Sequence, residues 1–461
     1  MRTALSIVVP GIVIVYLWAR CSKSPLAFCS LVVALTLGPA VYLNTWPISI
    51  HVPGLPAAVD WQDLAMLLMG GAWACVILAF RHRRPGRLVV GLDTWILLSL
   101  VFFLCLQVPM AWESDGRVAL GVPYAMRGWI YLPLSLGMWI SILRRVARVE
   151  VERFLDSLAW LMVPLSFLYC LSEIGIATNP YVGWAPFAVG NTVVVRDTLT
   201  FPFFTPLALA WFCSRRQQSV WTLGAQGVLL ASCVLSYSRT IAAGAVVIVV
   251  VVTLMRTGTS RAFSEGAKRV LAVATIVAIS GAGLVLLSPG QVGYALSRFA
   301  PSLQSGARET NTAHRLSWFR DGAAIVGQKD PLFGLGFGRE GASTMAAYSR
   351  QPGVFLGDFT WAVVIFTFGW LGLAVYGALY AQFVFLSFLN AVRRRVQPFG
   401  LASALVGLAF YDVIRTSATF PWGMYPTASA LALGLLYVDR RSAWAAVPHA
   451  GPVRNERELQ Q

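Results

Sequence analysis

The feature that most constrains the fold of this chain is a series of long hydrophobic runs that have no polar face. The segment after Arg239 reads TIAAGAVVIVVVVTLM, and the segment after Arg269 reads VLAVATIVAISGAGLVLL. A helix that is apolar all round belongs in lipid or in a large protein core. Charged residues make up only 12% of the 461 residues, against about 25% in soluble domains. We therefore expect an all-α, polytopic integral membrane protein.

The hydrophobic runs predict about twelve or thirteen transmembrane helices, because each crossing needs about 20 apolar residues. Thirteen spans put the N-terminus outside although Arg2 favours the inside, so one of the first two segments is a candidate not to cross. The N-terminal run has no small-residue cleavage site and is expected to be a retained first span. The predicted spans lie near 4–20, 25–43, 61–80, 93–112, 128–143, 154–176, 199–213, 219–237, 240–255, 269–288, 368–391, 398–415 and 422–438.

The net charge of +16 comes mainly from arginines at the ends of these spans. Such clusters mark cytoplasmic loops, and because they are short and belong to different loops they argue against a nucleic-acid partner. The clusters lie at 81–87, 144–153, 214–216, 256–261, 393–395 and 440–441. The external loops are then 44–60, 113–127, 177–198, 237–239, 289–367 and 416–421.

This topology divides the chain into four parts. Residues 1–288 hold the N-terminal helices, 289–367 form an external loop subdomain, 368–440 hold the C-terminal helices, and 441–461 are a polar tail expected to be disordered in the cytoplasm. The seven cysteines lie in or beside apolar runs with no metal-ligand spacing, and are expected to act as small core residues.

The external loop subdomain contains two patterned stretches. From Thr310, the positions of Leu316, Phe319, Ala323 and Ile325 predict an amphipathic helix on the membrane surface. The following PLFGLGFGRE has three alternating glycines, which let backbone amides approach a ligand or make a tight turn. The GxGxG pattern follows no strand, so a dinucleotide fold is excluded.

External arginines are exceptions to the positive-inside bias and need an explanation. An array of guanidiniums at the lipid–water boundary suits an anionic ligand with a tail in the bilayer, such as a lipid-linked pyrophosphate. For any single arginine the alternative is a snorkelling side chain or an ion pair, with Asp197, Glu309, Asp321 or Glu340 as partners. The external arginines are Arg127, Arg196, Arg239, Arg308, Arg315, Arg320, Arg339, Arg350 and Arg415.

Several of these arginines belong to short motifs that occur in a fixed order. The motifs are SYSR at 236–239, Arg315-x-x-Trp318 followed by Pro331-x-x-Gly334-x-Gly336-x-Gly338, Asp358 followed by Gly369-x-x-Gly372, and, more loosely, Arg196-x-x-x-x-Phe201. This order resembles the O-antigen polymerase and O-antigen ligase superfamily of bacterial envelopes. The resemblance covers roughly 190–395, and the first five spans share only their hydrophobicity with it.

The resemblance implies a multi-pass protein of the bacterial inner membrane that transfers an undecaprenyl-pyrophosphate-linked oligosaccharide to a second lipid-linked repeat unit on the periplasmic side. Asp358, Arg239 and Arg315 are the expected catalytic residues. The expected partners are the lipid-linked donor and acceptor and membrane lipid, with a chain-length regulator and a flippase as candidate protein partners. No DxD motif or ligand-spaced acid and histidine cluster occurs, so no metal or cofactor is expected. The expected substrate-binding residues are Arg196, Arg127, Arg320, Trp318, His314, Gly336 and Arg415.

Two alternatives remain open at this point. Ligases of this superfamily usually have His where this chain has Asp358, which favours a polymerase, although His314 beside Arg315 keeps a ligase possible. His314 could equally be a surface helix residue, and Asp358 could be a helix N-cap. A lipid-linked oligosaccharide flippase would need polar groups along a mid-membrane path, and the predicted spans carry almost none there.

Overall fold

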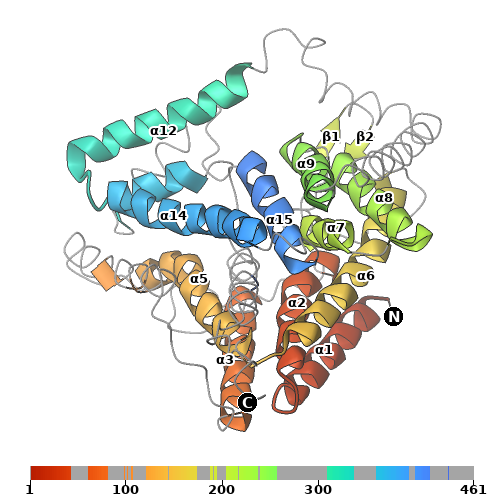
Figure 1. Ribbon diagram of the computed structural model, residues 1–461. Coiled ribbons are helices and arrows are strands. Elements are labelled where there is room, and N and C mark those ends of the chain that lie inside the picture. Colours follow the sequence, from red (N-terminus) through yellow and green to blue (C-terminus); the bar gives the residue numbers. More distant parts are fainter. Residues whose placement is uncertain are drawn as a thin grey trace, which may run out of the picture.

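The computed structural model describes residues 2–42, 61–80, 98, 101, 105–106, 121–143, 145–173, 187–189, 192–194, 204–215, 218–236, 239–256, 309–336, 360–393, 400–415 and 435. Figure 1 shows an almost entirely helical molecule. The helices are α1 Arg2–Arg20, α2 Pro25–Tyr42, α3 Trp61–Ala79, α5 Gly121–Leu143, α6 Arg148–Glu173, α7 Thr205–Ser214, α8 Val220–Leu235, α9 Arg239–Arg256, α12 Glu309–Lys329, α14 Thr360–Arg393 and α15 Leu401–Arg415. The strands are β1 Phe187–Val189 and β2 Thr192–Val194, which pair antiparallel.

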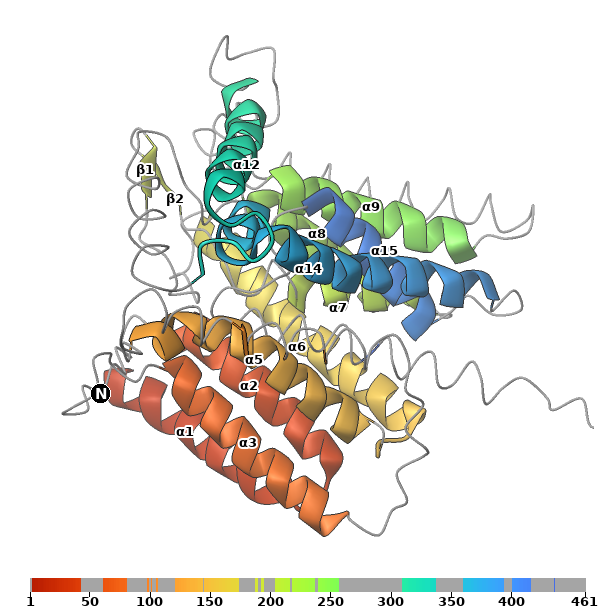
Figure 2. The same ribbon diagram turned by 90° about the vertical axis from the view of Figure 1, so that its left-hand side faces the viewer.

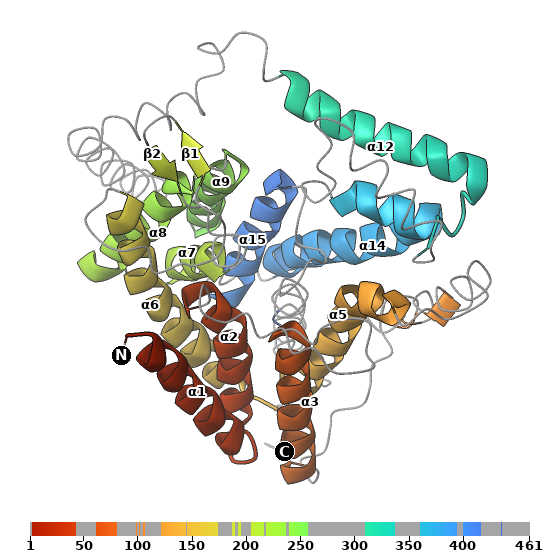
Figure 3. The ribbon, with the colours of Figure 1, turned by 180° about the vertical axis from the view of Figure 1, so that it is seen from behind.

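The helices form two groups linked by α6. In the first group α1, α2, α3 and α5 pack side by side, and in the second α7 lies among α6, α8, α9 and α15 (Figure 1). Every residue of α7 is buried. Seen from behind, α12 and α14 lie together on one side of α15, with α8 and α9 on the other (Figure 3).

Contacts within the second group fix the directions of its helices. Arg215, just after α7, forms an ion pair of 3.4 Å with Asp156 near the start of α6, so these two helices run antiparallel. The Tyr169 hydroxyl near the end of α6 donates to the Leu235 carbonyl at the end of α8, at 3.2 Å, so α6 and α8 run parallel. We call the end of this group where α6 and α8 finish the Glu173 end.

Helices α9 and α15 cross at very short range through two glycines. A Cβ atom at Gly244 would lie 2.5 Å from Cδ2 of Tyr411, and one at Gly407 would lie 2.5 Å from Cγ2 of Val252. These contacts pair the early part of α9 with the late part of α15, so the two helices are antiparallel. Small residues of this kind let backbones approach closely, as in membrane helix pairs.

Two of the described helices are long and apolar enough to cross a lipid bilayer. They are α6 and residues Trp361–Leu389 of α14, and eight other helices contain shorter apolar stretches of 10–17 residues. The prediction of a helical fold is confirmed, with one small addition: the β1–β2 hairpin lies in a segment that was predicted to be an external loop.

Several predicted boundaries differ from the observed ones. Helix α5 begins at Gly121 rather than near 128, α7 begins at Thr205 rather than near 199, and α14 begins at Thr360 rather than at 368. Counting apolar residues locates the hydrophobic centre of a helix but not the residue at which it begins. The predicted spans 93–112, 269–288 and 422–438 lie outside the described residues except for a few single positions, and the 441–461 tail lies wholly outside them.

Candidate functional site

Helix α12 packs on α14 through one buried face. Trp318 is 3% exposed and Val326 is fully buried, and Gly322 lies between them on the same face. A Cβ atom at Gly322 would lie 2.8 Å from Cε2 of Phe366 in α14. The amphipathic helix predicted from Thr310 therefore exists, but its buried face is centred on Trp318, Gly322 and Val326, and it covers α14 of the same chain.

The turn after α12 is held by its first residue. The Asp330 carboxylate oxygen Oδ1 accepts hydrogen bonds from the amides of Leu332, at 3.1 Å, and Phe333, at 3.0 Å. The Gly334 amide donates to the Asp330 carbonyl oxygen at 3.0 Å. Aspartate favours such turns because its short side chain reaches backbone amides two and three residues ahead.

This turn is inserted into the backbone of α14. In a regular helix the amides of Trp370 and Leu371 would donate to the carbonyls of Phe366 and Thr367. Here those amides donate to Pro331 and Leu332, at 3.0 and 3.1 Å. The vacated Phe366 and Thr367 carbonyls accept from the amides of the turn residues Leu335 and Gly336, at 2.8 and 3.1 Å. Four hydrogen bonds thus replace two, and we call Pro331–Gly336 with Phe366–Leu371 the Gly334–Gly369 junction.

Two glycines make this insertion possible. Gly369 has φ 60° and ψ −158°, a conformation that is essentially restricted to glycine, and it bends α14 at this point. A Cβ atom there would lie 2.6 Å from both the Gly334 amide nitrogen and the Leu332 carbonyl oxygen. A Cβ atom at Gly334, which has φ 78°, would lie 2.5 Å from the Gly369 nitrogen. Each glycine makes room for the other's backbone.

The junction decides between the two interpretations of the glycine run. The amides of Gly334 and Gly336 are both engaged within the protein, so these glycines form a tight turn and their amides do not cradle a ligand. Gly338 lies outside the described residues. The Gly336 amide donates to the Thr367 carbonyl, and a substrate-binding role for Gly336 stays a prediction. Trp318 is equally enclosed and acts as a packing residue, whereas Arg320 on the same helix is exposed.

The other predicted site residues are placed by their positions in the helices. Arg239 is the first residue of α9, and Arg415 is the last residue of α15. Because α9 and α15 are antiparallel, these two positions lie at the same end of the pair. The SYSR segment starts at Ser236, directly after α8, so this is the Glu173 end.

Three further predicted residues lie on two other helices, α12 and α5. His314 and Arg315 are on α12, one turn before Trp318. Figure 2 shows α12 and the β1–β2 hairpin on the side toward which α6 ends. Arg127 lies near the start of α5, about 24 Å along that helix from the turn that leads into α6. Arg196 and Asp358 lie outside the described residues; the first follows β2 by two residues and the second precedes α14 by two.

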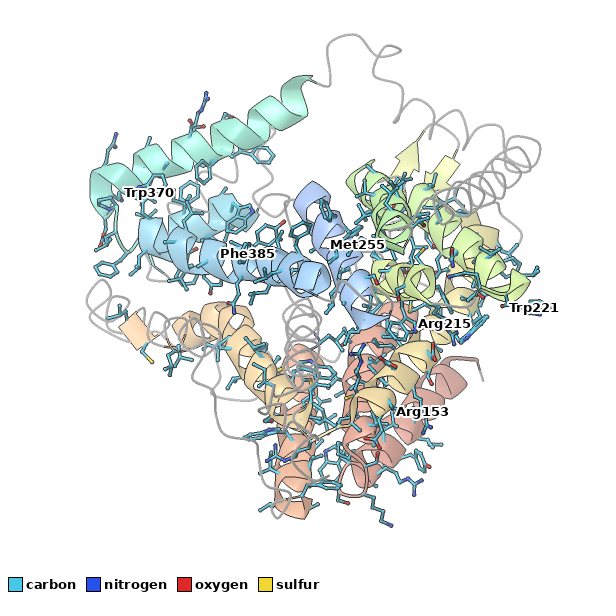
Figure 4. All side chains as sticks on the ribbon, viewed as in Figure 1. Arg153, Arg215, Trp221, Met255, Trp370 and Phe385 are labelled. Atoms are coloured by element: carbon cyan, nitrogen blue, oxygen red, sulfur yellow. The ribbon has the colours of Figure 1, made fainter. Side chains whose placement is uncertain are left out.

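Figure 4 labels side chains on two sides of the molecule. Trp370 lies beside α12, where its ring meets Phe319 edge-on at 6.4 Å between ring centres. Arg153 and Arg215 lie on the far side, around the start of α6 (Figure 4). There Arg148 pairs with Glu152 at 2.8 Å, in addition to the Arg215–Asp156 pair. The arginines predicted to be cytoplasmic thus include two that pair with acids of α6.

One charged residue of the Glu173 end was not among the predicted site residues. Glu173, the last residue of α6, is only 3% exposed, and it is the one charged side chain among the residues that the structure describes as buried. The available signal was its position inside the predicted span 154–176, because an acid within an apolar span is expensive and is usually functional.

Comparison with known proteins adds no family assignment. Neither the models of known protein families nor the curated proteins contain a match to this chain. The resemblance described above therefore rests on its sequence motifs. Within the described residues, no three His, Cys, Asp or Glu side chains are grouped so as to hold a metal ion.

Proposed function

We propose that the chain is a polytopic protein of the bacterial inner membrane. The support comes from α6, which is 26 residues long and apolar. Only 39% of its apolar stretch is buried inside the protein. The core helix of a soluble protein would be mostly buried, whereas α6 exposes 40–50% of several large apolar side chains, which suits lipid. These are Trp160 at 42%, Leu161 at 48%, Phe167 at 49% and Leu168 at 41%.

We infer that this protein polymerises undecaprenyl-pyrophosphate-linked oligosaccharide repeat units on the periplasmic face, as a metal-independent glycosyltransferase. The observation that carries the proposal is the Gly334–Gly369 junction. The P-x-x-G-x-G run and the G-x-x-G run were singled out separately as family-like motifs, and in the fold they share four backbone hydrogen bonds. Arg239, from the SYSR motif, is the first residue of α9 and lies at the Glu173 end; α12 lies on the side toward which α6 ends (Figure 2).

The chemistry needs two tasks from the protein. The acceptor hydroxyl oxygen attacks the anomeric carbon of the donor, the bond from that carbon to the pyrophosphate oxygen breaks, and the bond electrons leave with the pyrophosphate. Arg239, Arg315 and Arg196 stabilise the charge on this leaving group, and a well-placed donor of this kind contributes about 3–4 kcal/mol. Asp358 takes or orients the hydroxyl proton.

The test is a glycan analysis in a deletion strain that expresses wild-type protein, Arg239→Ala, Asp358→Ala or the control Arg215→Ala. Arg215 is paired with Asp156 at the opposite end, so its variant should support full-length polymer. The polymerase proposal expects a single repeat unit on the final acceptor in the deletion strain and in the Arg239→Ala strain at normal protein abundance. Full-length polymer that accumulates on the lipid carrier would instead identify a ligase, with His314 as the residue to test next.

A further inference from the structure

Two buried hydroxyl groups lie at the same level of the neighbouring helices α6 and α7. The two helices are antiparallel, and Asp156 of α6 pairs with Arg215, the residue after α7, at 3.4 Å. Ser166 lies ten residues beyond Asp156 along α6, a distance of about 15 Å. Thr205 lies ten residues before Arg215 along α7, again about 15 Å. Ser166 and Thr205 therefore reach the same level of the α6–α7 interface.

Both side chains lie on faces that pack inside the helix bundle. Thr205 lies seven residues before Phe212 and so on the same face of α7, and the Phe212 ring meets Trp160 of α6 edge-on at 5.0 Å between ring centres. Ser166 lies on the buried side of α6, one turn beyond Met162. Ser166 and Thr205 are both fully buried. The two hydroxyls thus belong to the packed interior and not to the lipid-facing surface.

Neither hydroxyl oxygen has a hydrogen-bond partner among the residues that the structure describes. These atoms are Ser166 Oγ and Thr205 Oγ1. A serine within a helix commonly donates to the carbonyl four residues earlier, as Ser157 of the same helix does to Arg153 at 3.0 Å. An unmet hydroxyl in a protein interior is costly, and buried polar groups left over by the fold are usually served by an ordered water.

The same level of both helices also lacks backbone donors. Pro164 lies inside α6, two residues before Ser166, and Pro206 directly follows Thr205 in the first turn of α7. Because proline has no N–H, Pro164 interrupts the hydrogen bonds within α6, and Pro206 leaves the first turn of α7 one donor short. Membrane helices tolerate such positions where Ser or Thr side chains and ordered waters satisfy the freed groups.

The chemistry of the site favours water over other small ligands. An anion would meet the Glu173 carboxyl, which lies seven residues beyond Ser166 on the same buried face of α6. An apolar group would leave both hydroxyls unmet. A water molecule has two donors and two acceptors, so it can serve one hydroxyl on each helix at once.

We propose that a buried water molecule binds between α6 and α7 and bridges the Ser166 and Thr205 hydroxyls. The bridge ties the part of α6 beyond Pro164 to α7, much as the Tyr169–Leu235 hydrogen bond ties that part to α8. It compensates the two hydroxyls that the protein itself leaves unmet. The water site is independent of the proposed catalytic activity, which uses other residues.

Hydroxyl-radical labelling of the purified wild-type protein tests the site without any substitution. Radiolysis of an internal water oxidises the side chains beside it, and methionine sulfur is readily oxidised. Met162 lies one turn before Ser166 on the same face and is fully buried, so the water site makes it severalfold more reactive than Met69, a buried methionine of α3. Oxidation is measured by mass spectrometry, and Met162 labelling no higher than that of Met69 overturns the proposal.

Equilibrium unfolding in detergent and SDS mixtures then tests the two hydroxyls. Ser166→Ala and Thr205→Val each remove one partner of the water, and each is expected to raise the unfolding equilibrium constant about fivefold. The effects of the two changes should be less than multiplicative in the double variant, because they disturb one shared water. A single variant that lowers the unfolding constant shows that the hydroxyl was unmet, and together with fully multiplicative effects this overturns the bridge.

Control variants separate the water from other effects of these substitutions. Ser157→Ala lies on the exposed side of α6 and reports the helix preference of alanine alone, so it should change the unfolding constant less than Ser166→Ala. Thr205→Ser keeps the hydroxyl and should keep the labelling of Met162. The double variant Ser166→Ala with Thr205→Val should lower that labelling to the level of Met69. Labelling that persists in the double variant places the water on other groups and overturns the bridge.

Discussion

The Gly334–Gly369 junction makes a quantitative prediction for Gly369→Ala. The added Cβ would lie 2.6–2.7 Å from three backbone atoms of the turn, and no side-chain rotation can relieve contacts with backbone. The junction must then open. Opening loses four hydrogen bonds, and α14 recovers two by closing its own ladder, a net loss of about 2 kcal/mol at about 1 kcal/mol each. Exposure of Trp318 and Val326 raises the free-energy cost of opening by about 4 kcal/mol. Alanine lowers this cost by about 1 kcal/mol because it favours the helix more than glycine does.

The expected effect is therefore a release of α12 at a cost of about 5 kcal/mol. Gly377→Ala is the matched control, because it lies in the same helix and its Cβ would meet nothing within 4 Å. Hydrogen exchange of the Leu335 and Gly336 amides measures the opening, because the Trp370 and Leu371 amides are protected again when α14 closes its own ladder. The net loss of two hydrogen bonds, about 2 kcal/mol, by itself corresponds to about a 30-fold loss of protection from exchange. Equal protection in Gly369→Ala and Gly377→Ala would show that the junction does not hold α12.

Two smaller changes test other parts of the same structure. Asp330→Ala removes the acceptor of the Leu332 and Phe333 amides and should cost about 1–2 kcal/mol, seen as faster exchange of these amides; Asp330→Asn keeps the acceptor and should restore protection, so a failure to do so argues against the turn. Gly407→Ala drives a Cβ to 2.5 Å from Val252 and should cost about 1–3 kcal/mol in thermal unfolding, whereas Gly224→Ala, with nothing within 4 Å, should not; equal midpoints would contradict the close α9–α15 crossing.

Among the described residues, hydrophobicity predicted most of the helices but not all of their ends. Runs such as that after Arg239 have one physical solution, a helix, so α9 was predicted near 240–255 and is observed at Arg239–Arg256. The start of α14 was missed because the apolar run Trp361–Leu389 has 29 residues, more than the roughly 20 that one crossing needs, so hydrophobicity did not fix where the helix begins. The bend at Gly369 depends on a partner segment more than thirty residues earlier in the chain. Local composition does not predict such a pairing.

The residues of the candidate site were selected from the sequence by their type, and their roles stay predictions. External arginines stood out because they break a charge rule, and Arg239 and Arg415 do lie at one end of the α9–α15 pair. Gly336 and Trp318 were predicted to bind substrate; in the fold the Gly336 amide makes a backbone hydrogen bond and the Trp318 side chain is buried. Glycine and tryptophan serve structure and recognition through the same properties, so only their observed contacts separate the two uses.

The junction also bears on how a loop can carry catalysis. Arg315 lies on α12 one turn before the buried Trp318, and Asp358 precedes α14 by two residues. The two candidate catalytic residues are far apart in sequence, but each is close to a helix that the junction fixes to the other. Precise catalytic geometry needs such rigid support, because a displacement of about 1 Å costs on the order of 100-fold in rate. A protein that places its chemistry outside the hydrophobic core can therefore gain rigidity by interlocking backbone hydrogen bonds. Substitution of Gly334 or Gly369 should then displace Arg315 and Asp358 relative to each other.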